Sequence, residues 1–331
     1  MKFYTWVHED KNKTEEQWKE HFKFLKEGGF DTVFLGGDFD FLQRVSPIAK
    51  KFGLEVQAWF WALNVNNDEI VQKEHPEWFN VSILGQSSLT DPPYVDYYKW
   101  LCPSKPEVRD YITEKIMKIL EIDSISGIHL DYIRHPDQYL PVGLLKNYDL
   151  EDKYYPEFDF CYCDTCKNKF KEQTGIDIST KENIDQDDDW FEFRLKSVID
   201  LVNHISENVH KIDKKITAAV FPTPDMASIM VRQDWSRWNI DGAFPMLYNQ
   251  FYNEDSVWIA DSVKECIEDS EDKFPVFAGI YIPELQMTEF NEAITYSINS
   301  GATGVSLFPS DKITKEHFDV INKIKRSTTR G

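Results

Sequence analysis

The segment from residue 127 to residue 136 (GIHLDYIRHP) joins a buried-strand pattern to a group of ionisable side chains. Ile128 and Leu130 alternate as the apolar residues of a strand, and a proline then ends its pairing. In a parallel α/β barrel, an acidic residue at the C-terminal end of a strand points into the mouth where catalysis takes place. Asp131 is therefore predicted to be a catalytic carboxylate. The alternative is an aspartate that caps the next helix or pairs with Arg134.

Hydrolysis of a glycosidic bond needs two carboxyl groups, one as the acid and the other as nucleophile or base. Asp131 suits the role of nucleophile or charge stabiliser, because Arg134 or His129 could hold it ionised. Its partner is expected to be Asp225, on a proline-braced turn after the fifth strand, or Glu284, after the seventh strand. Each of these two could instead be a helix N-cap or a first-turn acid.

Aromatic, amide and imidazole side chains follow the other predicted strands. Aromatic faces stack on sugar rings, whereas amides and imidazoles bind hydroxyl groups. His129 lies on the same side of its strand as Asp131, so it either donates to a sugar hydroxyl or is a satisfied core histidine. Trp59 or Trp61 is expected to stack on the sugar. The full set of predicted substrate-binding residues is Trp6, His8, Trp59, Trp61, His129, Arg134, Tyr248, Asn249 and Tyr281.

Four cysteines have spacing typical of a metal site. Cys161, Cys163 and Cys166 lie within six residues, and Cys102 precedes them in an earlier loop. Thiolates at such spacing wrap one tetrahedral ion, with Zn²⁺ as the default, and a fourth cysteine would close the site and make it structural. The alternatives are a disulfide or unrelated buried thiols. Cys266 lies in a helical pattern and is predicted to be a core thiol.

Short apolar runs alternate with longer amphipathic segments, which is the pattern of a (β/α)8 TIM barrel. Strands are predicted at 2–8, 32–36, 54–61, 127–133, 216–221, 241–248, 275–281 and 303–308, and helices at 15–27, 42–52, 107–122, 190–211, 255–268 and 289–299. An open doubly wound sheet would need a glycine-rich phosphate loop after its first strand, and residues 8–11 (HEDK) provide none.

The whole chain, residues 1–331, is read as one barrel domain, because no linker rich in Pro, Gly or Ser divides it. Long loops follow strands three and four (62–106 and 134–189), and the second is predicted to be an insertion that carries binding function. The acidic run 185–189 at its end is predicted to be the solvated start of a helix.

The composition narrows the range of partners. The formal net charge is -20 and no cluster of Lys and Arg stands out, so neither nucleic acid nor an anionic membrane is expected. No apolar stretch is long enough to span a membrane. Aromatic residues make up 15% of the chain, including 10 Trp, which suits a carbohydrate partner. No leader precedes the first strand, so we expect a periplasmic or extracellular protein if a signal peptide was removed and a cytoplasmic one otherwise.

Five segments carry a family pattern: 75–78 (HPEW), 100–109 (WLCPSKPEVR), 127–134 (GIHLDYIR), 245–248 (PMLY) and 301–308 (GATGVSLF). They resemble the hypothetical glycoside hydrolase family called "family 10-like" or DUF187-like, over nearly the whole chain. The resemblance implies a (β/α)8 barrel with carbohydrate-active chemistry, often in bacterial surface or periplasmic polysaccharide use. It also places Asp131 on the acidic residue of the strand-four motif.

The cysteines are similar to the structural zinc site of family 42 β-galactosidases. Those enzymes would be expected to carry a glutamate pair on strands four and seven, whereas strand four here ends in Asp131. The resemblance therefore extends to the metal site and not to the catalytic pair. We expect a glycoside hydrolase with a structural zinc and no organic cofactor. The alternatives are a carbohydrate-binding barrel without catalysis and a metal-dependent hydrolase that uses the cysteines.

Overall fold

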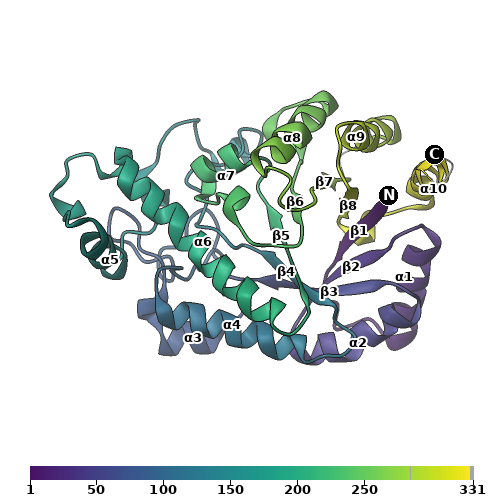
Figure 1. Cartoon of the computed structure of the whole chain (residues 1–331), viewed down its shortest axis with the longest axis horizontal. Helices are drawn as coiled ribbons and strands as arrows, with labels where there is room; N and C mark the ends of the chain where they lie inside the picture. The colour runs from purple at the N-terminus through teal and green to yellow at the C-terminus, as the bar shows by residue number, and fades with distance from the viewer. Residues whose placement is uncertain (284, 329–331) are drawn as a thin grey trace.

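A computed structural model describes residues 1–283 and 285–328. Eight parallel strands form one sheet in the order β6-β5-β4-β3-β2-β1-β8-β7, and helices surround it (Figure 1). The strands are β1 (Lys2–Val7), β2 (Thr32–Gly36), β3 (Glu55–Trp61), β4 (Gly127–Asp131), β5 (Lys215–Val220), β6 (Ala243–Pro245), β7 (Phe277–Tyr281) and β8 (Gly304–Phe308). Parallel bridges Ala243↔Val276 and Met246↔Gly279 join the two edges. This is the predicted (β/α)8 barrel.

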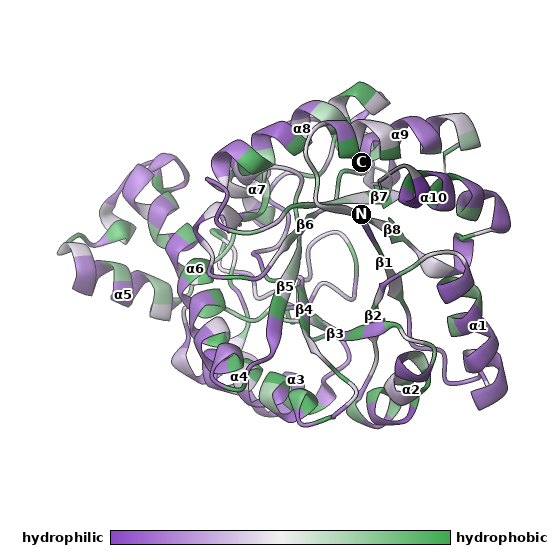
Figure 2. Ribbon diagram, turned by 45° about the vertical axis from the view of Figure 1, so that its right-hand side comes forward, coloured by the Kyte–Doolittle hydropathy of each residue, from purple (hydrophilic) through white to green (hydrophobic). Residues whose placement is uncertain are grey.

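The helices fill the spaces between the strands. They are α1 (Glu15–Glu27), α2 (Phe39–Lys51), α3 (Glu69–Glu74), α4 (Pro106–Leu120), α5 (Asp164–Thr174), α6 (Asp188–His210), α7 (Pro224–Val231), α8 (Ser256–Asp269), α9 (Met287–Asn299) and α10 (Lys315–Thr328). Most carry both hydrophobic and hydrophilic residues, as helices with one buried face do (Figure 2). None of the described helices is long and apolar enough to cross a membrane.

The sequence placed all eight strands but not all of their ends. The sixth strand was predicted at 241–248 and is only three residues long, because the chain leaves the sheet after Pro245. The short helices α3, α5 and α7 and the C-terminal α10 were missed. The acidic run was read correctly: Asp187 caps α6 by accepting from the Trp190 amide at 2.9 Å, and two further aspartates fill the first turn.

The barrel interior holds its own aromatic cluster, separate from the apolar layer between strands and helices. Buried Tyr4, Trp6, Phe34 and Phe244 pack there, because alternate residues of each strand face inward. At the end of β2, Gly36 leaves space for the Trp59 ring, since a Cβ at this position would lie 2.9 Å from a ring carbon. The interior is therefore filled below the C-terminal ends of the strands, and any ligand must bind above it.

The long loop after β4 builds a second small core. Figures 1 and 2 both show α5 at the outer edge of the molecule, beyond α6. Its core contains the four clustered cysteines together with Phe160, Phe170, Trp190 and Phe193. The loop is thus ordered, and α6 connects it to the barrel.

Candidate active site

Asp131 is the last residue of β4, and two N–H groups hold its carboxylate. Oδ2 accepts from the Trp59 indole at 2.9 Å, and Oδ1 accepts from the Tyr132 amide at 2.7 Å. Burial raises the pKa of the Asp131 carboxyl, while these two hydrogen bonds and the charge of Arg134 act in the opposite direction. Asp131 therefore stays protonated to a higher pH than an ordinary aspartate. Once it is ionised, the two N–H groups fix the orientation of its carboxylate.

The backbone turns sharply directly after this carboxylate. Tyr132 has a φ of 49°, the left-handed region that few side chains adopt. Its ring packs on Trp61 with 4.5 Å between centroids, which offsets part of the cost of that conformation. The turn sends the following residues away from the mouth, so the side chain of Asp131 is the last from β4 to face it.

Aromatic rings lie near the C-terminal ends of several strands around the barrel, of which only β3 is a direct neighbour of β4. On one side the exposed His8 meets the Trp59 ring edge-on at 4.8 Å, and Trp61 lies 6.2 Å from Trp59. On the other side Tyr248 stacks against Phe308 at 6.2 Å and contacts Tyr281 at 5.5 Å. Asp131 helps to raise the pKa of the Tyr248 hydroxyl, after the larger effect of burial, which places the two groups close together.

A groove of 840 Å³ opens on the Trp59 side of Asp131, between the ends of β1, β2 and β3 and the helix α4, and Asp131 itself is not among the described residues that line it. Trp59, Trp61 and His8 line it together with Asn64 and Asn66 from the loop after β3. This volume falls in the range of small-molecule binding sites. Flat apolar faces next to amides match the two surfaces of a sugar ring, its carbons and its hydroxyls. The groove therefore suits a carbohydrate better than a purely apolar ligand.

His129 is a core histidine. Its ring is fully buried and stacks on Phe34 at 3.6 Å. The Trp6 indole donates to Nε2 at 3.0 Å, and Nδ1 lies 2.8 Å from the Thr217 hydroxyl. Because an indole can only donate, Nε2 must be unprotonated, and Nδ1 carries the proton and donates to Thr217. Burial lowers the pKa of His129 well below 6.5, in keeping with this neutral form.

Arg134 does not pair with Asp131. Its guanidinium donates to Asp137 at 2.9 Å and stacks on the rings of Trp100 and Phe221 at 4.8 Å each. The expectation that Arg134 helps to keep Asp131 ionised agrees with its charge, which lowers the pKa of that carboxyl. The hydrogen bonds to the carboxylate come from the Trp59 indole and the Tyr132 amide instead. The arginine contributes only through its charge.

The predicted substrate-binding residues divide into two groups. Four of them are buried and hydrogen-bonded to other protein groups, so they are not open to a ligand: Trp6, His129, Arg134 and Asn249. The Asn249 side-chain amide donates to the Glu254 carbonyl at 2.9 Å. Three of the others, His8, Trp59 and Trp61, line the groove. The buried Tyr248 and the half-buried Tyr281 contact each other near the ends of β6 and β7. Alternation along a strand predicted the direction of each side chain, but not how far up the barrel the filled core extends.

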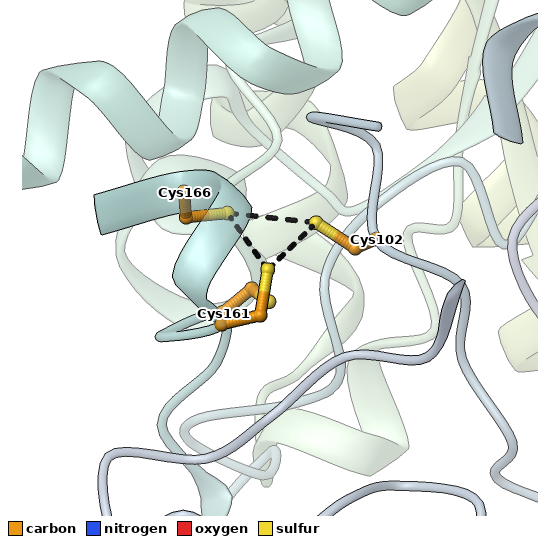
Figure 3. Close-up of side chains that lie close together, drawn as sticks. Cys102, Cys161 and Cys166 are labelled. Atoms are coloured by element: carbon orange, nitrogen blue, oxygen red, sulfur yellow. Dashed lines mark hydrogen bonds between the residues drawn. The ribbon is translucent and has the colours of Figure 1, made fainter. Parts of the chain in front are cut away.

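The four predicted cysteines meet. Cys102, Cys161, Cys163 and Cys166 are all buried, and their sulfur atoms lie within 4.8 Å of one another. Cys102 is 3.7 Å from Cys163 and 3.5 Å from Cys166, and Cys163 is 3.6 Å from Cys166. Figure 3 shows Cys102, on the chain before α4, facing Cys166 on α5.

These spacings fit one tetrahedral ion. Sulfur atoms bound at about 2.3 Å to one zinc would lie about 3.8 Å apart, whereas a disulfide would bring two of them to about 2.05 Å. The described cysteines are all free thiols, and the Val81 amide donates to Cys161 at 3.4 Å, as amides near bound thiolates do. The cluster is therefore compatible with a structural metal, which would tie the loop after β4 to the loop after β3.

The comparisons with known proteins agree with this geometry. A model of the family described as "Glycosyl hydrolase-like 10" matches residues 11–299. The chain belongs to the glycosyl hydrolase-like 10 family. No curated protein matches it.

Several solved structures resemble this glycosyl hydrolase-like 10 protein in fold. The catalytic domain of a β-amylase from Paenibacillus polymyxa has a TM-score of 0.64 at 13% identity, covering 96% of this chain and 94% of the other. An endo-1,4-β-D-mannanase from Thermotoga petrophila RKU-1 has a TM-score of 0.57 at 11% identity, covering 98% and 99%. At these identities the likeness shows the fold, a TIM barrel shared with glycosidases.

Of the two predicted acid partners of Asp131 in this glycosyl hydrolase-like 10 barrel, the structure describes only Asp225. Asp225 lies in the first turn of α7, exposed, with Thr223 as the N-cap, and its charge contributes to raising the pKa of Asp269 on α8. This is the environment of a helix first-turn acid. Glu284 lies outside the described residues, so its role stays a prediction.

Glu9 was not singled out from the sequence. It follows β1, lines the groove and forms an ion pair with Lys11 at 3.3 Å. The other described groove carboxylates, Asp38 and Asp68, both cap helices. Its position just after a strand could have identified Glu9, because strand ends meet at the mouth.

Proposed function

We propose that this protein is a glycoside hydrolase that cleaves a poly- or oligosaccharide, with Asp131 as the leading catalytic carboxylate. The observation that carries the proposal is the carboxylate at the end of β4, fixed by the Trp59 indole and surrounded by aromatic rings. Two fixed N–H donors hold both oxygens in one orientation, as a nucleophile or charge stabiliser requires.

The acid partner is proposed among three carboxyl groups. Asp225 and Glu284 follow from the sequence, and Glu9 is added because it lines the groove. A carboxyl group that protonates a leaving oxygen must stand opposite Asp131 across the bond, at about 5–5.5 Å for retention or about 6.5–9.5 Å for inversion. Asp225 fits this least, since it is exposed in the first turn of α7.

A carbohydrate-binding barrel without catalysis is the second candidate. It shares the aromatic mouth and differs only in lacking a working acid. The half-buried, hydrogen-bonded Asp131 favours catalysis, because a platform for binding alone would gain little from a carboxylate partly removed from water.

A metal-dependent hydrolase is less well supported. A catalytic zinc keeps one coordination position open for water, whereas four thiols complete a tetrahedron. Cys102, Cys161, Cys163 and Cys166 also belong to the core around α5 rather than to the mouth. We therefore propose that the cysteines hold a structural zinc. Location in the periplasm or outside the cell, after removal of a signal peptide, or otherwise in the cytoplasm, stays a prediction.

The test of the function is a screen of α- and β-linked glucans, mannans and galactans for release of reducing ends. Hydrolysis of at least one glycan is expected. Calorimetric titration of the same glycans separates the two candidates, because binding without release of reducing ends would identify the binding barrel. If the protein neither binds nor hydrolyses any glycan of a broad panel, both candidate functions are contradicted.

A further inference from the structure

A second cavity lies between the start of α4 and the helices α5 and α6, away from the groove at the mouth. Its volume is 90 Å³. A single buried water molecule needs a cavity volume of about 10–15 Å³, so this cavity admits a small polyatomic ion with some water. The lining contains no strand residue, and the cavity is therefore separate from the barrel mouth.

Positive charge is concentrated around this cavity, in a protein whose net charge is -20. Four basic side chains line it, against one acidic side chain: Lys105, Arg109, Lys169, Lys196 and Asp200. The acid is already paired with Lys196. Among the residues that the structure describes, no carboxylate lies within ion-pair distance of Lys105 or Lys169. Like charges around a small space repel one another, and a bound anion would offset that repulsion.

Hydrogen-bond donors are left over at the same place. Lys105 uses one donor on the Thr165 hydroxyl at 2.9 Å, and Lys169 uses one on the Ser104 carbonyl at 2.5 Å. An ammonium group has three donors, so each lysine keeps two. The N–H group at Nε of Arg109 has no hydrogen-bond partner among the described residues, although Oδ1 of Asp110 lies 3.7 Å from it as an ion pair.

The N-terminal end of α4 adds a further donor surface. This helix of 15 residues begins with Pro106, and its N-cap residue Lys105 makes no side-chain capping bond. Its first amides therefore lack the acceptor that a cap would supply, and the helix dipole favours an anion there.

One buried hydroxyl points to a ligand independently of the helix. Ser104 is only 7% exposed and lines the cavity. Its Oγ has no hydrogen-bond partner among the described residues. A buried polar group without a partner costs free energy, which a ligand oxygen in the cavity would recover.

We propose that this cavity binds a tetrahedral oxyanion, phosphate or sulfate, between the start of α4 and the side chains of Ser104, Lys105, Arg109 and Lys169. The ion joins α5 to the barrel next to the cysteine cluster, since Ser104 follows Cys102 by two residues and Lys169 follows Cys166 by three. The site is independent of the glycosidase proposal and does not depend on its outcome.

The experiment is calorimetric titration of the whole protein with inorganic phosphate and, separately, with inorganic sulfate. Chloride keeps the ionic strength constant. One ion per chain is expected to bind. Lys169→Met and Ser104→Ala should each weaken binding by about tenfold or more. Glucose 6-phosphate is a third ligand: tighter binding than inorganic phosphate assigns the site to phosphate esters, and weaker binding assigns it to the free ion.

Lys167→Met is the matched control, because it removes the same charge from the same helix outside the cavity lining. Equal weakening by Lys167→Met and Lys169→Met would mean diffuse attraction and would overturn the proposal. So would the absence of saturable binding of all three ligands. Circular dichroism checks that Lys169→Met folds. If it does not, Arg109→Gln takes its place in the titration and must weaken binding more than Lys167→Met does.

Discussion

The Trp59 indole donates a 2.9 Å hydrogen bond to the Asp131 carboxylate across neighbouring strands. Trp59 itself pairs in register with His129, and Trp61 with Asp131. Trp59 thus orients the carboxylate, and Trp61 packs beside Trp59 in the lining of the groove. The aromatic surface and the candidate catalytic group are built as one unit, so a change in either should alter the other.

Replacement of Trp59 by phenylalanine should raise the pKa of Asp131 further, because the indole hydrogen bond is one of the contributions that lower it. If Asp131 must be ionised to act, the acid limb of the pH profile of kcat/KM will move to higher pH. Trp61→Phe is the control, since no hydrogen bond joins Trp61 to Asp131 among the described contacts. It should change KM and leave the acid limb in place. Equal profiles for both variants would contradict the assignment.

The cysteine cluster should contain one metal ion per chain, measured by elemental analysis. Chelation should lower Tm on the order of 10 °C, because metal binding contributes directly to folding free energy. Cys102→Ser should lose the metal, whereas Cys266→Ser should keep it, since Cys266 instead donates to the Pro222 carbonyl. A metal that affects turnover without affecting Tm would argue for a catalytic ion.

A buried ion network beside the cluster should be important for stability. Asp159 forms ion pairs with Arg194 and Arg232, and all three are almost fully buried. Asp159→Asn leaves two buried cations without a counter-charge, so the free energy of unfolding in urea should fall by about 3–5 kcal/mol. Glu151→Gln, which breaks an exposed pair with Lys153, should leave the free energy of unfolding almost unchanged. A similar small loss for both would contradict the network's role.

Histidines that the fold removes from water, among them His21 and His129, should make the protein less stable in mild acid. Burial lowers the pKa of His21 to about 4 and that of His129 well below 6.5. Because the unfolded chain binds these protons more readily, stability is complete above pH ~6.5 and falls as the pH drops below it. For His21 the loss between pH 7.5 and pH 5 should be about 2 kcal/mol, and His129 should add to it in the same direction. His129→Gln should reduce that loss, and an unchanged pH dependence would contradict the neutral form.

The sequence predicted the barrel and the position of Asp131 because both depend on local patterns. Apolar and polar residues alternate along the strands, and Asp131 is the residue at which β4 ends. The cysteine cluster was also predictable, because three of its members share one short segment. The short helices α5 and α7 were missed, since their apolar contacts are with distant parts of the chain.

The partners of Asp131 could not be read from the sequence for a different reason. Trp59 reaches it through the register between β3 and β4, which only the closed sheet fixes. Arg134 is near in sequence, but the left-handed Tyr132 turns the chain so that the arginine meets Asp137 instead. Proximity in sequence therefore indicated the charge that acts on Asp131, whereas the hydrogen bond from Trp59 depends on pairing between strands.

The most direct measurement of the central claim is the turnover of Asp131→Asn on a glycan that the wild-type protein hydrolyses. Circular dichroism checks that the variant folds, and calorimetry that it still binds the glycan. We expect turnover to fall by several orders of magnitude with folding and binding largely retained, because the carboxylate acts on the reacting bond. Turnover close to that of the wild type would contradict the assignment of Asp131 as the catalytic carboxylate.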